Sequence, residues 1–153
     1  MPGMDVDIGR DTLVALAAVA WADGNIEPSE AAGIRSAAQQ LKLGADDLRL
    51  VEETLSRPVP LAEVETIRMS RLTRLFTYAV ANWIAQIDGS VPPEEQAALD
   101  LLGERLGLSS VARERAKTVA LSLTQTGAGG VADLDVLKLR SRLSAGLSQI
   151  GVE

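Results

Sequence analysis

The strongest constraint on this chain is an internal repeat, because the sequence resembles itself when it is shifted by 65 residues. Without any gap, "WADGNIEPSE" at 21–30 aligns with "QIDGSVPPEE" at 86–95. Identical pairs continue on both sides of these stretches, at Ala20/Ala85, Ala32/Ala97, Leu41/Leu106 and Leu43/Leu108. The period is too long and the copies too few for a solenoid. We therefore predict a duplicated three-helix unit, with halves at about 11–56 and 76–123 that pack about a pseudo-two-fold axis.

Apolar residues recur at helical spacing through most of the chain, and no segment shows the alternation of a strand. The predicted helices begin near Asp11, Pro28, Asp46-Asp47, Pro93 and Val111, and the segment 61–87 contains neither Pro nor Gly. A further amphipathic helix is predicted at about 132–150, outside the repeat. A length of 153 residues suits one compact domain. The fold class is therefore predicted as all-α, a single domain over 1–153 with about seven helices.

Composition excludes several function classes. The chain has no cysteine and no histidine, so it has no thiolate or imidazole metal ligands and no histidine-based acid–base catalysis. A net charge of −6 argues against nucleic-acid binding. The longest apolar run, at 13–22, is too short to cross a bilayer, and the acidic N-terminus does not resemble a signal peptide. Ser and Thr residues have no partnering base. We expect a cytoplasmic, non-enzymatic protein without membrane insertion or an organic cofactor.

The repeated loop reads D-G-x-[I/V]-x-P-x-E, which coincides with the second half of an EF-hand loop. The first and third ligand positions of that loop would carry Val19 and Trp21 in one copy, and Ile84 and Gln86 in the other. Because these side chains are not carboxylates, a working EF-hand pair is not expected. The acidic residues of the motif stay as candidate ligands for a hard divalent cation such as Ca²⁺, Mg²⁺ or Mn²⁺: Asp23, Glu30, Asp88 and Glu95.

Helix capping offers an alternative explanation for most of the motif. Glycine suits the left-handed residue that ends a helix, and proline suits the first helical position. Glu30 and Glu95 then fall at the third helical position, where a glutamate can reach back to the N-cap amide. Capping does not explain Asp23 and Asp88, which meet the negative end of a helix dipole. A cation between each aspartate and the glutamate seven residues later would relieve that repulsion.

These paired loops in a small, acidic, helical chain resemble the TerB-like family of tellurite-resistance and stress-associated proteins. The resemblance rests on "WADGNIEPSE" and "QIDGSVPPEE" with the helices that follow them, and it covers roughly 12–120. It implies a helical bundle of two equivalent halves whose acidic loop residues bind a divalent cation. Pro92 stands where the first copy has Glu27, so the resemblance allows the two loops to bind unequally.

Three functional hypotheses follow from these features. The first is a cation-binding stress or sensor module, with Asp23/Glu30 and Asp88/Glu95 forming two weak sites or one shared site. The second is a metal-free helical adaptor that binds a partner protein in an apolar groove between the halves. The third, an enzyme that holds Mg²⁺ for phosphoryl transfer, lacks a phosphate-binding loop. Trp21 and Trp83 lie close to the two loops and could line a pocket, although such residues more often belong to the core.

Overall fold

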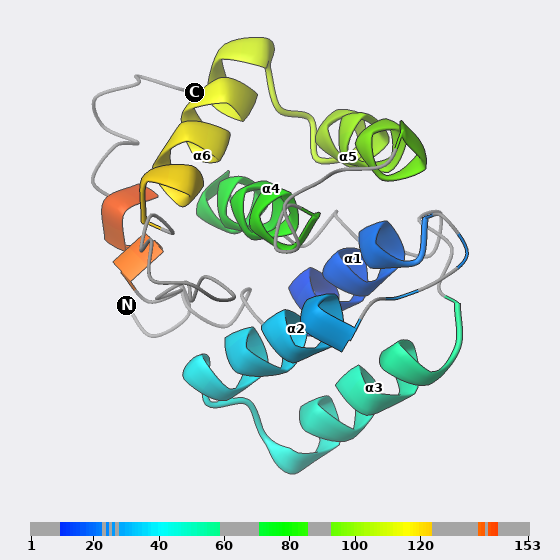
Figure 1. The fold of residues 1–153 in the computed structure, drawn as a ribbon. Helices are drawn as coiled ribbons and strands as arrows, with labels where there is room; N and C mark the ends of the chain where they lie inside the picture. Colours follow the sequence, from blue (N-terminus) through cyan, green and yellow to red (C-terminus); the bar gives the residue numbers. More distant parts are fainter. Residues whose placement is uncertain are drawn as a thin grey trace.

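The computed structural model describes residues 10–22, 24, 26, 28–58, 71–85, 93–123, 138–139 and 141–143. Within these ranges all regular structure is helical, which confirms the all-α bundle. The labelled helices are α1 (Arg10–Ala20), α2 (Pro28–Gln40), α3 (Ala45–Ser56), α4 (Arg71–Ala85), α5 (Pro93–Arg105) and α6 (Ser110–Leu123). Figure 1 shows α1 and α4 in the interior, with the other helices around them.

The helix boundaries reproduce the repeat of the sequence. The helix α2 begins at Pro28 and ends at Gln40, and α5 begins and ends 65 residues later. The starts of α3 and α6 are related by the same shift. The turns after α2 and α5 also match, because Lys42 has a φ of 56° and Gly107 has a φ of 70°. A non-glycine residue at positive φ is uncommon. The shared turn geometry therefore shows that the backbone repeats even where the side chain does not.

The two halves meet through α1 and α4. The Oγ1 atoms of Thr12 and Thr77 lie 2.9 Å apart in a hydrogen bond, and both residues are fully buried. These threonines are 65 residues apart, so each contacts its own equivalent. Around this pair, α1 also packs on α5, and α4 packs on α2. A contact between equivalent residues, flanked by reciprocal helix contacts, is the pattern of a two-fold axis. The pseudo-two-fold axis therefore passes between α1 and α4.

The core is built around α4, in which every residue from Leu75 to Ala85 is buried. Phe76 is fully buried there, and the larger Trp83 is 3% exposed. In α1, Leu13, Leu16 and Val19 are buried on the opposite side of the axis. Burying one such side chain contributes roughly 1.5–3 kcal/mol. The unusually apolar composition of these two helices thus follows from their position between the remaining helices.

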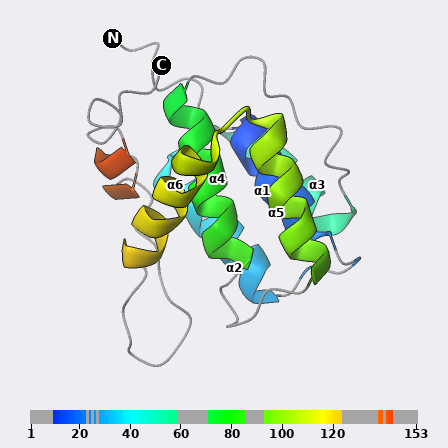
Figure 2. The ribbon, with the colours of Figure 1, turned by 90° about the horizontal axis from the view of Figure 1, so that it is seen from above.

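The second half departs from the first in the position of its third helix. In the first half α3 packs on both α1 and α2, whereas α6 packs most extensively on α4. A stripe of small residues on α6, Ala112, Ala116 and Ala120, is buried and recurs at the four-residue spacing of one helix face. In Figures 1 and 2, α6 runs away from α5 toward its C-terminal end. The pseudo-symmetry therefore holds for α1, α2, α4 and α5 but is relaxed for α6.

Several sequence predictions can be compared directly with these helices. The third helix begins at Ala45, with Gly44 at the N-cap and no side-chain cap, so Asp46 and Asp47 lie inside its first turn. Of the segment 61–87, residues 71–85 are helical and 61–70 lie outside the described residues. Of the predicted helix at 132–150, residues 138–139 and 141–143 are described; they are helical, and Leu139 and Leu143 are buried. None of the described helices is long and apolar enough to span a membrane.

Candidate functional site

The two repeated loops connect α1 to α2 and α4 to α5. In the first loop Gly24 has a φ of +86°, and its N–H donates to the carbonyl oxygen of Trp21 at 2.8 Å. This is the left-handed residue predicted at the end of the helix. A Cβ atom at Gly24 would meet nothing within 4 Å, so the glycine is required by its backbone conformation and not by crowding. The candidate ligands Asp23 and Asp88 lie outside the described residues.

Both candidate glutamates are buried. Glu30 in the first turn of α2 and Glu95 in the first turn of α5 are each 2% exposed. Each of them has an interaction with another group in the structure. Carboxylates are rarely buried to this extent, because removing their charge from water is costly unless other groups compensate. The repeat therefore places two buried carboxylates at equivalent positions.

The burial of these glutamates was not predicted from the sequence, although a signal for it is present. Glu30 lies four residues before Ile34 and seven before Ala37, both of which are buried. Glu95 has the same spacing to Leu99 and Leu102. Side chains at these spacings share one face of a helix. The two glutamates therefore lie in phase with the core positions of their own helices.

The capping explanation does not apply equally to both loops. In a capping box, the glutamate at the third helical position accepts a hydrogen bond from the backbone N–H of the residue before the helix. The residue before α2 is Glu27, which has that N–H, whereas the residue before α5 is Pro92, which has none. Glu95 therefore cannot form this bond to the residue before its helix. Helix capping in this form cannot be the common reason why both glutamates are buried.

The first loop is fastened to α3 through Trp21. Its Nε1–H donates to the carbonyl oxygen of Thr54 at 2.7 Å, and the Thr54 hydroxyl donates to the carbonyl oxygen of Val51 at 2.7 Å. The residue equivalent to Trp21 in the second half is Gln86, which lies outside the described residues. Trp83, by contrast, is a core residue of α4, and its buried Nε1–H has no hydrogen-bond partner among the described residues. The expectation that both tryptophans contribute to packing is confirmed, since Trp21 packs partly buried against the core.

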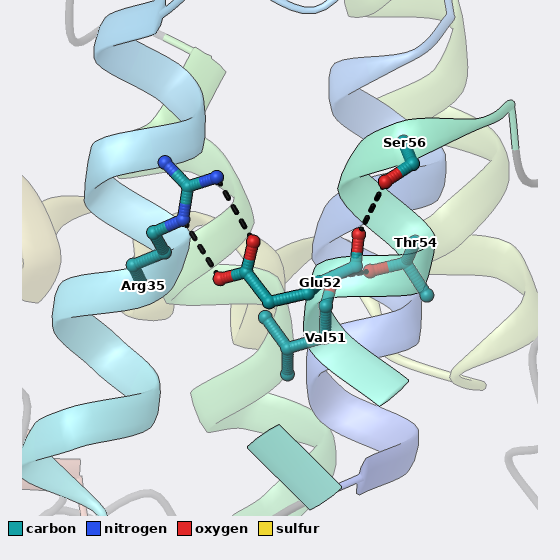
Figure 3. A network of polar contacts seen from close by, with 5 residues as sticks. All are labelled: Arg35, Val51, Glu52, Thr54 and Ser56. Carbon is teal, nitrogen blue, oxygen red and sulfur yellow. Dashed lines mark hydrogen bonds and ion pairs between the residues drawn. The ribbon is translucent and has the colours of Figure 1, made fainter. Parts of the chain in front are cut away.

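An exposed ion pair joins α2 to α3 near this loop. Arg35 donates two hydrogen bonds to the carboxylate of Glu52, at 2.9 and 3.0 Å (Figure 3). The hydrogen bonds from Arg35 hold the pKa of the Glu52 carboxyl below its ordinary value. The same contact raises the pKa of the Arg35 guanidinium. Because both side chains are about half exposed, this pair orients the two helices more than it stabilises them.

The described residues by themselves do not complete a metal site. Within the described ranges, no group of three or more acidic side chains is arranged so that it could hold a metal ion. A site at either loop would therefore combine the buried glutamate with Asp23 or Asp88 and with backbone carbonyl oxygens.

Two open hollows lie on the outer helices. One, of about 300 Å³, is lined on α3 by acidic and basic residues that include Asp46, Arg49 and Glu53. The other, of about 430 Å³, is lined on α6 by Val111, Glu114, Arg115 and Thr118. Positions 46, 49, 50 and 53 correspond to 111, 114, 115 and 118 through the 65-residue shift. Neither of these hollows is lined by a described residue of α1 or α4, so neither is the groove predicted between the halves.

Residues 7–119 match the family of proteins of unknown function designated DUF533. The chain belongs to the DUF533 family. The match includes both loops, the helices α1 to α5 and most of α6. No curated protein and no solved structure matches this DUF533 chain.

Proposed function

We propose that the protein binds a divalent cation through its two Asp-Gly loops, with Asp23 and Glu30 as ligands in the first and Asp88 and Glu95 in the second. The observation that supports this proposal is the burial of Glu30 and Glu95 at equivalent positions, each 2% exposed. Each of these glutamates already interacts with another group of the protein, and a bound cation would add to the compensation that a buried carboxylate needs. The residues that precede α2 and α5 in the sequence, Glu27 and Pro92, differ in having a backbone N–H, which weakens the alternative that a shared capping bond accounts for both.

The chemistry of the donors limits which cations are suitable. Carboxylate and carbonyl oxygens are hard ligands, which favours Ca²⁺, Mg²⁺ or Mn²⁺. Each loop supplies two carboxylates, so backbone carbonyls and water would have to complete the coordination. We therefore expect modest affinity. The cation would act by holding each loop against its helix, and no catalytic step is assigned to it.

The family relationship bears on the biological role of the protein. The DUF533 family is related to the TerB-like superfamily, whose paired acidic loops this sequence resembles. We infer a non-enzymatic role in the stress or tellurite response from that relationship, in a cytoplasmic setting. Direct thiol chemistry on tellurium is not available to a chain without cysteine.

The proposal is tested by titrating the metal-stripped protein with Ca²⁺, Mg²⁺ and Mn²⁺. Melting temperature and tryptophan fluorescence are both followed, because a ligand that binds the folded state raises its stability by mass action. A cation present at a hundred times its Kd stabilises the fold by about 2.7 kcal/mol. Trp21 lies two residues before Asp23 and reports on the first loop. The double variant Asp23→Asn/Asp88→Asn should stay helical and lose the response. An unchanged melting temperature at millimolar concentrations of all three metals would refute the proposal.

The alternative is a metal-free helical adaptor that binds a partner protein. It is favoured by one observation, the hollow on α6, where Val111 is 71% exposed. Val111 is the most exposed large apolar side chain among the described residues, so it is available for contact with a partner protein. If metals have no effect on the protein while Val111→Ser abolishes association with a partner, the adaptor hypothesis is preferred.

A further inference from the structure

The two halves carry the same pair of opposite charges between their second and third helices, but with the signs exchanged. In the first half Arg35 on α2 is paired with Glu52 on α3. The equivalent positions in the second half are Asp100 on α5 and Lys117 on α6. Among the described residues no ion pair joins Asp100 to Lys117, and Asp100 instead accepts a hydrogen bond from Gln96 at 3.3 Å. The second half thus contains the charges of the first-half ion pair without the contact.

An arginine lies between the two helices where this contact would form. The Nε–H of Arg113 on α6 donates to the carbonyl oxygen of Leu108 at 3.0 Å. Its side chain lies against α5, because a Cβ atom at Gly103 would be 2.7 Å from the Arg113 Nε atom. The equivalent residues of the first half are Leu48 and Ala38, on two helices that pack directly on each other. Arg113 therefore occupies the space into which α6 would move to approach α5.

The part of α4 that lies beneath α5 and α6 is polar, whereas the equivalent part of α1 is apolar. Tyr78 and Asn82 on α4 are buried there, and the Asn82 amide donates to the carbonyl oxygen of Tyr78 at 2.9 Å. Their first-half equivalents are Leu13 and Ala17. Burial raises the pKa of the Tyr78 phenol, which also senses the charges of Arg113 and Asp100. Polar groups from α4, α5 and α6 thus converge in the second half, whereas the first-half equivalents of Tyr78 and Asn82 on α1 are apolar.

We propose that the second half is a two-state device in which α6 closes on α5. In the open state described above, Arg113 is bonded to Leu108 and α6 lies on α4. In the closed state Arg113 leaves that carbonyl, and Lys117 pairs with Asp100 as Arg35 pairs with Glu52 in the first half. The inference concerns the side of the molecule that carries α5 and α6, and it does not depend on cation binding by the loops.

Two features of the chain permit this movement. The connection between α5 and α6 contains Gly107 at a φ of 70°, where the first half has Lys42. Glycine is accommodated at positive and negative φ with similar ease, so this turn can act as a hinge in the second half alone. The contact surface of α6 on α4 is the stripe of Ala112, Ala116 and Ala120. Small side chains interlock less deeply than large ones, which lets one helix slide past another.

The test measures the distance between α5 and α6 with pairs of spin labels. The chain has no cysteine, so labels can be placed at Ala97→Cys and Thr118→Cys without removing native thiols. The matched reference pair is Ala32→Cys and Glu53→Cys, which lies 65 residues earlier on α2 and α3. All four positions are exposed. We expect one narrow distance for the reference pair and two distances for the second-half pair.

Removing the arginine should shift the balance toward the closed state. In Arg113→Leu, which installs the first-half residue, the ratio of shorter to longer distance should rise by roughly two- to tenfold, the factor expected for the loss of one hydrogen bond. Arg113→Gln should shift it in the same direction and serves as the test if the leucine variant does not fold. The reference pair should not respond to either change. A single second-half distance that is the same with and without Arg113 would overturn the proposal.

Changing the charges at positions 100 and 117 distinguishes the two-state movement from a purely structural role of Arg113. Lys117→Asp places like charges between α5 and α6 and should abolish the shorter distance. Adding Asp100→Lys to that variant gives the charge order of the first half and should restore it. A shorter distance that is insensitive to the charges at positions 100 and 117 would also overturn the proposal. Circular dichroism melts of each variant establish that the compared proteins are folded.

Discussion

The hydrogen bond between Thr12 and Thr77 gives the sharpest prediction about how the two halves are joined. Both residues have no exposed surface, and their hydroxyl oxygens are 2.9 Å apart. In Thr77→Val the hydroxyl of Thr12 loses that partner in a place that water does not reach. Leaving one buried polar group without its partner costs about 1–3 kcal/mol, whereas replacing both partners with apolar groups of the same shape is nearly neutral. We therefore expect each single valine substitution to destabilise the fold by about 1–3 kcal/mol.

The double variant Thr12→Val/Thr77→Val should be more stable than the sum of the two single effects predicts. In a protein of this size each kcal/mol shifts the melting temperature by about 2–4 °C, so the single variants should be measurably less stable and the double variant should recover most of the loss. Urea unfolding followed by circular dichroism gives the three free energies. Thr118→Val, on the exposed face of α6, is the matched control and should change stability by less than about 0.5 kcal/mol. Single effects that add within about 0.5 kcal/mol would refute the idea that the two hydroxyls satisfy each other.

Four further predictions concern single side chains. Burial raises the pKa of Tyr78, the only tyrosine, so its absorbance should show a phenol that ionises above its ordinary pKa. The stability that depends on the neutral phenol should be lost as pH rises through that folded-state pKa. Ionisation at pH 10 would contradict this prediction. Trp21→Phe removes a hydrogen bond and should lower the free energy of unfolding by about 1 kcal/mol in urea titrations. Trp83→Phe removes a donor that has no hydrogen-bond partner among the described residues, so it should cost less than the cavity that it leaves would by itself. A loss of more than about 3 kcal/mol in the free energy of unfolding would contradict this expectation. Because the pKa of Glu52 is lowered, its contribution to stability is present above the ordinary carboxyl pKa and is lost as pH falls through the folded-state pKa. Glu52→Gln should therefore lower the free energy of unfolding by at most about 1 kcal/mol at pH 7 and leave it unchanged at pH 2. An equal cost at both pH values would exclude the ion pair with Arg35 as its cause.

Local signals in the sequence predicted most of the helices correctly. Pro28 and Pro93 mark the first residues of α2 and α5, because proline at this position loses no helical hydrogen bond. Gly24 has the positive φ that was predicted from its place after an apolar helix. The repeat predicted the bounds of α5 and the start of α6 from those of α2 and α3, but not the position of α6. These predictions depend on a few neighbouring residues, which is why they could be made without a structure.

Features that depend on distant contacts were not predicted. The pairing of Thr12 with Thr77 joins two helices whose relative rotation is set by the packing of the whole core. The position of α6 depends on Arg113 and Gly103, which are unremarkable as single residues and become informative only when their contact is seen. The burial of Glu30 and Glu95 could be predicted only in part, because their spacing along the helix indicated the core while their charge indicated the surface. Phase determined the outcome, and Asp23 and Asp88 stay predictions because they lie outside the described residues.

The contact between Thr12 and its own equivalent has a consequence for how this chain can change. Two identical subunits make such contacts across a dyad, and in a homodimer every substitution alters both sides of the interface at once. Here both sides belong to one chain, so each position has two copies that can be substituted separately. Arg35 with Glu52 and Asp100 with Lys117 illustrate this freedom, since the charge order differs between the halves while the starts of the helices repeat. A single-chain dyad can thus hold one half closed and leave the other half free to take up a different task.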